Sequence, residues 1–224
     1  MVEEESVAKI DRTASVSPKA QIDPSAIIGP FCVIERGVVV GADVLVRSHT
    51  VLYPGVVIGA GSQTGHHTIV RGGVKIGRDC VIGSFVEIRP TAKIGNSVVL
   101  QTGVFVSEGT QLEDEVWVGP YAIFLNDPHP PCGKCMRGAV VRRGAVIGGG
   151  AIILPHIIIN RGALIGAGAL VTRDIPEGAV VKSEYGTHVA KHVSWLRCKF
   201  GKEIPPPLLR WRRACVDRDG KETD

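Results

Sequence analysis

The stretch that decides the fold is residues 76–94, IGRDCVIGSFVEIRPTAKI, in which isoleucine recurs at every sixth position. The same register runs from Ile10 to Phe124, and nineteen of its twenty positions are large and apolar; Thr64 is the exception. The residue four places after each is small or β-branched. Neither a helix nor a regular strand has a period of six. The pattern therefore predicts short strands joined by tight corners, three of which close a triangular turn of about 18 residues.

The composition agrees with a coil of this kind. Of 224 residues, 28 are glycine, 44% are hydrophobic and only 5% are aromatic, so the interior must consist mainly of aliphatic side chains. This hydrophobic content excludes a disordered chain. Glycine does not recur at every third residue, which excludes collagen. The length fits one domain with a short appendage.

The register is interrupted once and then ends. It stops at Phe124 and resumes at Val141, and the prolines between them are incompatible with regular strand pairing, so residues 125–139 are predicted to leave the coil as a loop. We expect a β-helix domain over residues 1–182. The remaining tail, 183–224, is predicted to contain a short helix at 187–196 and to be disordered over its last ten residues.

Charge and hydropathy exclude several classes. The net charge of +4 lies mostly in the last forty residues and is low for a general nucleic-acid binder. The acidic N-terminus is not a signal peptide, and no apolar run is long enough to span a membrane. The six cysteines are too scattered for a disulfide framework. We therefore expect a cytoplasmic protein that binds neither nucleic acid nor a membrane.

The repeat resembles that of the hexapeptide-repeat acyltransferases over roughly residues 10–182. The resemblance implies an all-β, left-handed parallel β-helix, although a period of six does not by itself set the hand. The stretches 64–71 and 117–130 are similar to those of enzymes that N-acetylate amino sugars on nucleotide carriers. Membership of that subgroup implies a homotrimer, acetyl-CoA as co-substrate bound between adjacent helices, and a nucleotide-linked amino sugar as acceptor.

Thr64 and the two histidines after it form a polar cluster within the apolar register, and local rules are often broken at functional sites. Folding the sequence once per triangular turn stacks two columns on one corner: Ser48, His66, Ser84 and Thr102, beside His49, His67, Phe85 and Gly103. We expect His66 to act as the catalytic base and His67 to contact substrate. The alternative is a corner histidine that only hydrogen-bonds its neighbours.

The loop supplies the second group of candidates. Asn126 is expected to orient the acceptor amine and Asp127 to hold it as an ammonium group, unless the two form only an Asx turn. They fall on a different face from His66, so a trimer would have to bring the loop of one chain to the corner of the next. Glu87, on a coil edge, is a further candidate for substrate binding, with a solvated face as the alternative.

Glycine- and alanine-rich coils near the C-terminus are expected to hold the coenzyme. The pantetheine arm would lie along Gly149, Ala151, Gly166 and Ala167, and basic side chains would meet the phosphates. The basic candidates are Arg143, Arg161, Arg173 and Lys182. The alternative is that these small residues only serve the corners of the coil.

Other functions remain open on the sequence alone. The acceptor could be a hydroxyl rather than an amine, which would make the protein an O-acetyltransferase. A zinc enzyme of the γ-carbonic anhydrase kind and a non-catalytic scaffold are the remaining interpretations. The spacing of His129, Cys132 and Cys135, with Cys198 as a fourth ligand, resembles a zinc site, but a single CxxC is weak and we expect free thiols and no metal.

Overall fold

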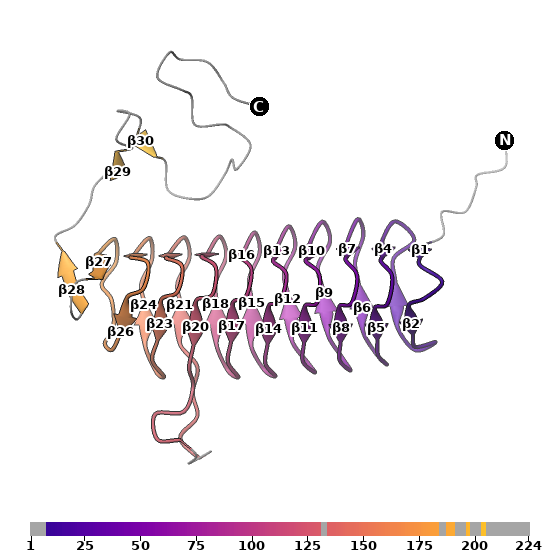
Figure 1. Ribbon diagram of the computed structural model, residues 1–224, viewed down its shortest axis with the longest axis horizontal. Coiled ribbons are helices and arrows are strands. Elements are labelled where there is room, and N and C mark those ends of the chain that lie inside the picture. Colours follow the sequence, from indigo (N-terminus) through magenta and orange to yellow (C-terminus); the bar gives the residue numbers. More distant parts are fainter. Residues whose placement is uncertain (1–7, 131–133, 184–186, 191–195, 198–202, 205–224) are drawn as a thin grey trace.

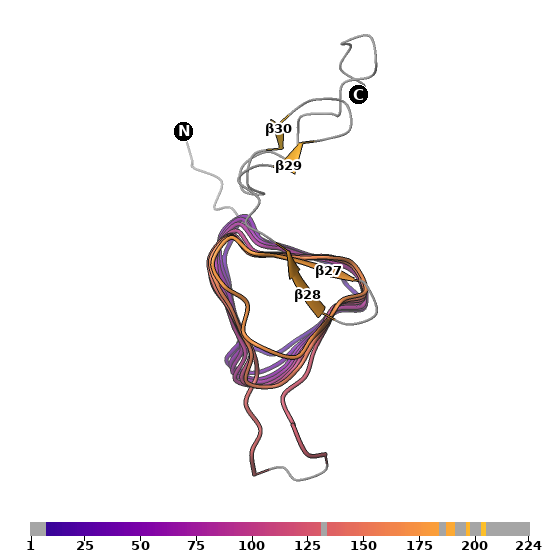
Figure 2. The ribbon, with the colours of Figure 1, turned by 90° about the vertical axis from the view of Figure 1, so that its left-hand side faces the viewer.

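The computed structural model describes residues 8–130, 134–183, 187–190, 196–197 and 203–204. Its main body is a long coil of short parallel strands (Figure 1) that is triangular in cross-section (Figure 2). Three sheets, one on each side of the triangle, run the length of the coil. The expected all-β, left-handed parallel β-helix is therefore confirmed.

Up to β26, each sheet collects every third strand of the chain. The first sheet contains β1 (Lys9–Ile10), β4 (Ile27–Ile28), β7 (Leu45–Val46), β10 (Gln63–Thr64), β13 (Val81–Ile82), β16 (Val99–Leu100), β19 (Trp117–Val118), β22 (Val146–Ile147), β25 (Leu164–Ile165), β27 (Val180–Ser183) and β28 (Thr187–Ala190). The second contains β2 (Ser15–Val16), β5 (Val33–Ile34), β8 (Val51–Leu52), β11 (Ile69–Val70), β14 (Glu87–Ile88), β17 (Phe105–Val106), β20 (Ile123–Phe124), β23 (Ile152–Ile153) and β26 (Leu170–Val171). The third contains β3 (Gln21–Ile22), β6 (Val39–Val40), β9 (Val57–Ile58), β12 (Lys75–Ile76), β15 (Lys93–Ile94), β18 (Gln111–Leu112), β21 (Val140–Val141) and β24 (Ile158–Ile159). A separate antiparallel pair joins β29 (Leu196–Arg197) to β30 (Glu203–Ile204).

The register of the sheets follows the hexad directly. Each residue pairs with its equivalent in the next turn, as Thr64 does with Ile82. The second residue of each strand points inward and the first points outward, because successive side chains of a strand alternate between its faces. From β4 to β26 the inward residues are buried.

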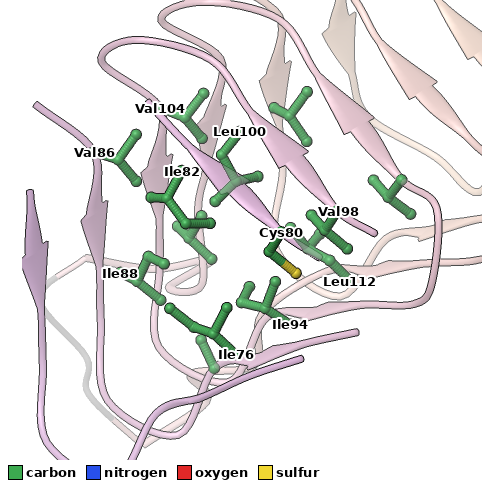
Figure 3. Close-up of a cluster of buried hydrophobic side chains, with 14 of the residues drawn as sticks. Ile76, Cys80, Ile82, Val86, Ile88, Ile94, Val98, Leu100, Val104 and Leu112 are labelled. Atoms are coloured by element: carbon green, nitrogen blue, oxygen red, sulfur yellow. The ribbon is translucent and has the colours of Figure 1, made fainter. Parts of the chain in front are cut away.

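The core is a stack of these inward aliphatic side chains (Figure 3). Ile76, Ile82, Ile88 and Ile94, from the stretch that defines the register, are at most 5% exposed, and small residues such as Cys80 fill the corners between them. Burying an aliphatic side chain contributes about 1.5–3 kcal/mol. The repetition of this contribution along the coil is what stabilises a fold with such short strands.

The predicted loop is confirmed by a jump in strand register. Ile94 pairs with Leu112, one regular turn further along the chain, but Leu112 pairs with Val141, which is a longer step. The extra residues leave the coil between β20 and β21. The loop that they form projects from one corner of the triangle (Figure 2). At its base, the N–H of Arg137 donates to the carbonyl of Asn126 at 2.8 Å.

The C-terminal end of the coil corrects one prediction. Residues 187–190, expected to begin a helix, form β28, which pairs antiparallel with β27 across the end of the triangle (Figure 2). The terminal strand of a sheet presents unpaired backbone groups, and a following strand satisfies them where a helix could not. Leu196 is also in a strand, while residues 191–195 and the last ten residues lie outside the described part of the chain.

Candidate functional site

Three edges separate the three sheets, and they carry different side chains. We call the corner between the first and second sheets the first edge, which includes His66 and His67. The second edge, between the second and third sheets, is where the loop leaves. The third edge lies between the third and first sheets and includes Glu115.

His66 sits on the first edge with its ring held by the coil beneath it. The Oγ of Ser48 lies 2.8 Å from Nδ1 of His66, and the His66 backbone N–H donates to Oγ of Ser84 at 3.0 Å. The predicted stacking of Ser48, His66 and Ser84 is therefore present. If Nδ1 carries the proton and donates to Ser48, the lone pair of Nε2 is left free to accept a proton. The side chain of His66 is exposed, as a base acting on a bound substrate must be.

Thr64, the exception in the register, has a structural explanation. Its side chain is 1% exposed, and its Oγ1 lies 3.2 Å from Oγ1 of Thr50 and accepts the backbone N–H of Arg47 at 3.2 Å. The hydroxyls of Thr50 and Thr68 both donate to the carbonyl of Gly65 at 3.1 Å. A buried hydroxyl is tolerated when it is hydrogen-bonded. This network supports the corner directly beneath His66.

His67 belongs to a ladder of stacked rings along the first edge. Its ring centroid lies 4.5 Å from that of His49 and 5.1 Å from that of Phe85, and Phe31 continues the ladder 5.0 Å from His49. All four residues have a positive φ, a conformation unusual for side chains other than glycine. Both faces of the His67 ring are covered by neighbours, so only the edge of the ring is open to a ligand.

Asn126 and Asp127 lie at the second edge, one side of the triangle away from His66, as predicted. Oδ1 of Asp127 accepts the backbone N–H of His129 at 2.9 Å, which is the Asx turn given as the alternative. Nδ2 of Asn126 lies 3.6 Å from Sδ of Met136, across the loop. Both side chains are half-buried at the base of the loop.

Glu87 is not simply solvated. One of its oxygens, Oε1, accepts hydrogen bonds from Arg71 and Arg89, and Arg71 also contacts Tyr53. Neither arginine was among the site residues expected from the sequence. The signal was present, since Tyr53, Arg71 and Arg89 occupy the same place in successive turns and therefore stack.

The residues expected to hold the coenzyme are divided among all three edges of the coil, with Arg143 and Arg161 on the third edge. Gly149, Gly166, Ala167 and Lys182 lie along the first edge, in the C-terminal coils. Arg173 follows β26 as Asn126 follows β20, so it lies at the second edge. Ala151 is a correction: it is 0% exposed, its N–H donates to Gly148 and its carbonyl accepts from Ile123, so it is part of the core.

Gly149 and Ala167 are neighbours on the first edge and offer hydrogen-bond donors. Their N–H groups make no hydrogen bond to any residue of the described chain, although those of the adjacent Gly150 and Gly168 do. A Cβ on Gly148 would lie 2.4 Å from the nitrogen of Ala167, so the absence of a side chain there allows the coils to approach. Extended ligands with amide carbonyls fit such a pair of donors.

The third edge carries an ion-pair cluster of its own. Arg142 donates to Glu113, and Arg143 donates to Glu115 at 2.9 Å. Burial raises the pKa of the Glu113 carboxyl, but hydrogen bonds from Arg142 and from the Arg143 backbone outweigh it, so the pKa is lowered. Two shallow hollows of about 420 and 370 Å³ lie beside this cluster and are lined in part by Arg143, with Arg161 lining the second.

Neither a membrane-spanning helix nor a cluster of metal-binding side chains occurs among the residues that the structure describes. None of the segments covered by the structure forms a helix that is long and apolar enough to cross a bilayer. No group of three or more histidine, cysteine, aspartate or glutamate side chains is arranged to hold a metal ion among the residues that the structure describes. Cys132 and Cys198, two of the four residues with zinc-like spacing, lie outside those residues.

Comparison with known proteins agrees with this architecture. A family model described as the bacterial transferase hexapeptide (six repeats) matches residues 55–90 and, overlapping them, 73–108. None of the curated proteins compared with the chain matches it. The matched part of the chain therefore has hexapeptide repeats of the bacterial transferase kind, as the sequence resemblance predicts.

Two solved structures extend the likeness beyond the matched repeats. A UDP-N-acetylglucosamine acyltransferase is 20% identical with a TM-score of 0.58, over 81% of this chain and 73% of that one. LpxA, a UDP-N-acetylglucosamine acyltransferase from Bacteroides fragilis, is 18% identical with a TM-score of 0.52, over the same shares of the two chains. At these identities the likeness establishes the β-helix fold.

Proposed function

We propose that the protein is an acetyltransferase that moves an acetyl group from acetyl-CoA to the amine of a nucleotide-linked amino sugar. The observation that carries the proposal is an exposed histidine, His66, whose ring is oriented by Ser48 on the edge of a transferase-type hexapeptide helix. The two acyltransferases of similar fold act, by their names, on a nucleotide sugar. That substrate class motivates the acceptor proposed here.

The chemistry requires few groups. Neutral His66 takes a proton from the acceptor as its amine attacks the thioester carbonyl carbon, forming the C–N bond. The tetrahedral oxyanion is stabilised by a backbone N–H, and its collapse breaks the C–S bond. Coenzyme A leaves as the thiolate, which the proton held on His66 can neutralise. The N–H groups of Gly149 and Ala167, which make no hydrogen bond within the described chain, would donate hydrogen bonds to the amide carbonyls of the pantetheine arm.

The active site would be shared between copies in a homotrimer. His66, Gly149 and Ala167 are on the first edge, while Asn126 and Arg173 are on the second, and the width of the second sheet separates them in one chain. A site that uses both groups is complete only when the first edge of one copy meets the second edge of the next. Exposed apolar side chains favour this packing. Among the strands and corners, they include Ile27 on the first sheet, Val33 and Leu170 on the second sheet, and Phe85 on the first edge.

The test combines assembly with activity. Sedimentation of the full-length protein should give the mass of a trimer, and release of free thiol from acetyl-CoA should depend on an aminated nucleotide hexose. The corresponding hydroxyl sugar is the matched control acceptor, and preference for it would indicate an O-acetyltransferase. A monomer, or a protein that does not bind acetyl-CoA by calorimetry, would contradict the proposal.

A further inference from the structure

The outward column of the second sheet has a single charged position. From β5 to β26 the residues that point outward are Val33, Val51, Ile69, Glu87, Phe105, Ile123, Ile152 and Leu170. A carboxylate within an apolar stripe breaks the local pattern, and such breaks concentrate at functional sites. Glu87 therefore needs an explanation beyond a solvated surface.

The side chains around Glu87 form an ordered cluster. Its Oε1 accepts from Nε of Arg71 at 3.0 Å and from Nη1 of Arg89 at 3.1 Å, and it lies 3.0 Å from Nη2 of Arg71. Nη1 of Arg71 donates to the hydroxyl of Tyr53 at 2.8 Å, and the guanidinium carbon lies 4.8 Å from the centroid of the Tyr53 ring. Arg71 is thus held on three sides, and it fixes Glu87 in turn.

The cluster carries excess positive charge. Two guanidinium groups share one carboxylate, which leaves a net charge of +1. Arg71 donates to Glu87 from Nε and to Tyr53 from Nη1, whereas Arg89 donates to Glu87 through Nη1 and has a side chain that is 42% exposed. Arg89 therefore presents the rest of its planar fork of N–H donors to the surface, an arrangement that matches a phosphate oxygen pair.

The cluster lies at the edge from which the loop leaves. Arg71 and Arg89 directly follow β11 and β14, at the ends of these strands nearest the second edge. β14 pairs with β17, and β17 pairs with β20, which the loop that contains Asn126 follows. β14 and β20 are therefore two strand spacings apart, which corresponds to about 10 Å. A ligand with an anionic group at Arg89 can therefore extend toward Asn126 along the same edge.

We propose that Arg89 binds the diphosphate of the nucleotide carrier, and that Glu87, Arg71 and Tyr53 are positioning residues that hold Arg89 in place. This inference rests on the proposed function and specifies where its acceptor is anchored. It also changes the expected role of Glu87 from substrate binding to positioning. A carboxylate would repel a phosphate group, but it can orient the guanidinium group that binds the phosphate.

The test is calorimetric titration of the full-length protein with UDP and, separately, with coenzyme A. Wild type should bind both. Arg89→Gln should weaken UDP binding at least about tenfold, the value of a lost charged hydrogen bond, and leave coenzyme A binding unchanged. Arg89→Lys should not restore UDP binding, because a lysine lacks the planar fork. Lys93→Gln, which removes the same charge from the third sheet, is the matched control and should leave both affinities intact.

Tyr53→Phe tests the positioning role, because it removes only the hydroxyl that anchors Arg71. It should weaken UDP binding less than Arg89→Gln while leaving thermal unfolding unchanged. The inference is overturned if wild type does not bind UDP, if Arg89→Gln binds it normally, or if Arg89→Gln weakens coenzyme A instead. Binding of UDP through Arg89 without any binding of coenzyme A would support this site and contradict the proposed function, so the two failures can be told apart.

Discussion

Ser48 and His66 lie one coil apart on the first edge, with Oγ of the serine 2.8 Å from Nδ1 of the histidine. This hydrogen bond orients the imidazole from below, and the stacked geometry of the β-helix places the two side chains together although they are distant in sequence. In the function proposed above, this relationship favours His66 as the general base and Ser48 as its positioning residue.

Replacing these two residues should separate the two roles. His66→Ala should lower the acetyl-transfer rate by about 10²–10⁴, the usual contribution of a general base. Ser48→Ala should cost about tenfold or less, because it removes one orienting hydrogen bond. Thr102→Ala, which removes a hydroxyl from the same column two coils from His66, is the control. Steady-state kinetics check all three, and full activity of His66→Ala would refute the assignment of the base.

A large side chain at Ala167 should block the coenzyme. Ala167 is exposed on the first edge and precedes Gly168, which has a φ of 69°. Ala60 occupies the equivalent position on the third edge, exposed and before Gly61 with a φ of 70°. Ala167→Trp should reduce coenzyme A affinity at least tenfold in calorimetry, whereas Ala60→Trp should not. Equal effects of the two substitutions on coenzyme A affinity would contradict the placement of the coenzyme on the first edge.

Gly65 should be intolerant of any side chain. A Cβ there would lie 2.2 Å from the nitrogen of Ser84 and 2.5 Å from the carbonyl carbon of Gly83, which are backbone atoms of the next coil. Gly65→Ala should therefore lower the free energy of unfolding by about 1–3 kcal/mol, the usual cost of overpacking. At Gly72 the nearest atom would be 3.3 Å away, so Gly72→Ala serves as the control in denaturant unfolding. Similar midpoints for the two variants would contradict the packing argument.

The described cysteines should differ in reactivity. Burial raises the pKa of Cys80 to about 11 and also raises that of Cys32, and the two thiols donate to carbonyls of Gly95 and Arg47 inside the coil. Cys135 is exposed in the loop. Because the thiolate is the reactive form, iodoacetamide should modify Cys135 in the native protein and spare Cys32 and Cys80. Peptide mapping by mass spectrometry checks this, and rapid labelling of Cys80 would mean that the coil opens.

The ion pair at Glu113 should make a small, pH-dependent contribution to stability. Although burial raises the pKa of Glu113, the hydrogen bonds from Arg142 and Arg143 lower it overall, so the carboxylate stabilises the fold above its unfolded-state pKa. That contribution is lost as the pH falls through the lowered folded-state pKa. Glu113→Gln should cost no more than about 1 kcal/mol at pH 7, since the pair is exposed. The difference from wild type should disappear in acid and shrink in high salt, as followed by denaturant unfolding.

Much of this molecule follows from the sequence alone. The hexad register fixes which residues point inward, and the triangular turn fixes which side chains stack, so the core and the Ser48–His66–Ser84 column could be predicted by counting. The same counting placed the loop at the second edge. These features are predictable because each coil repeats the geometry of the last, and position in the repeat determines position in space.

The three-dimensional structure decided what the repeat leaves open. It showed that Thr64 is explained by a buried hydrogen-bond network, that Ala151 belongs to the core, and that Arg71 and Arg89 surround Glu87. It also replaced a predicted helix with β28, because the end of a sheet leaves backbone groups to be paired and local helical preference does not account for that. A period assigns each residue its place on the coil, whereas the partner that a side chain finds depends on its rotamer and its neighbours in the adjoining coils.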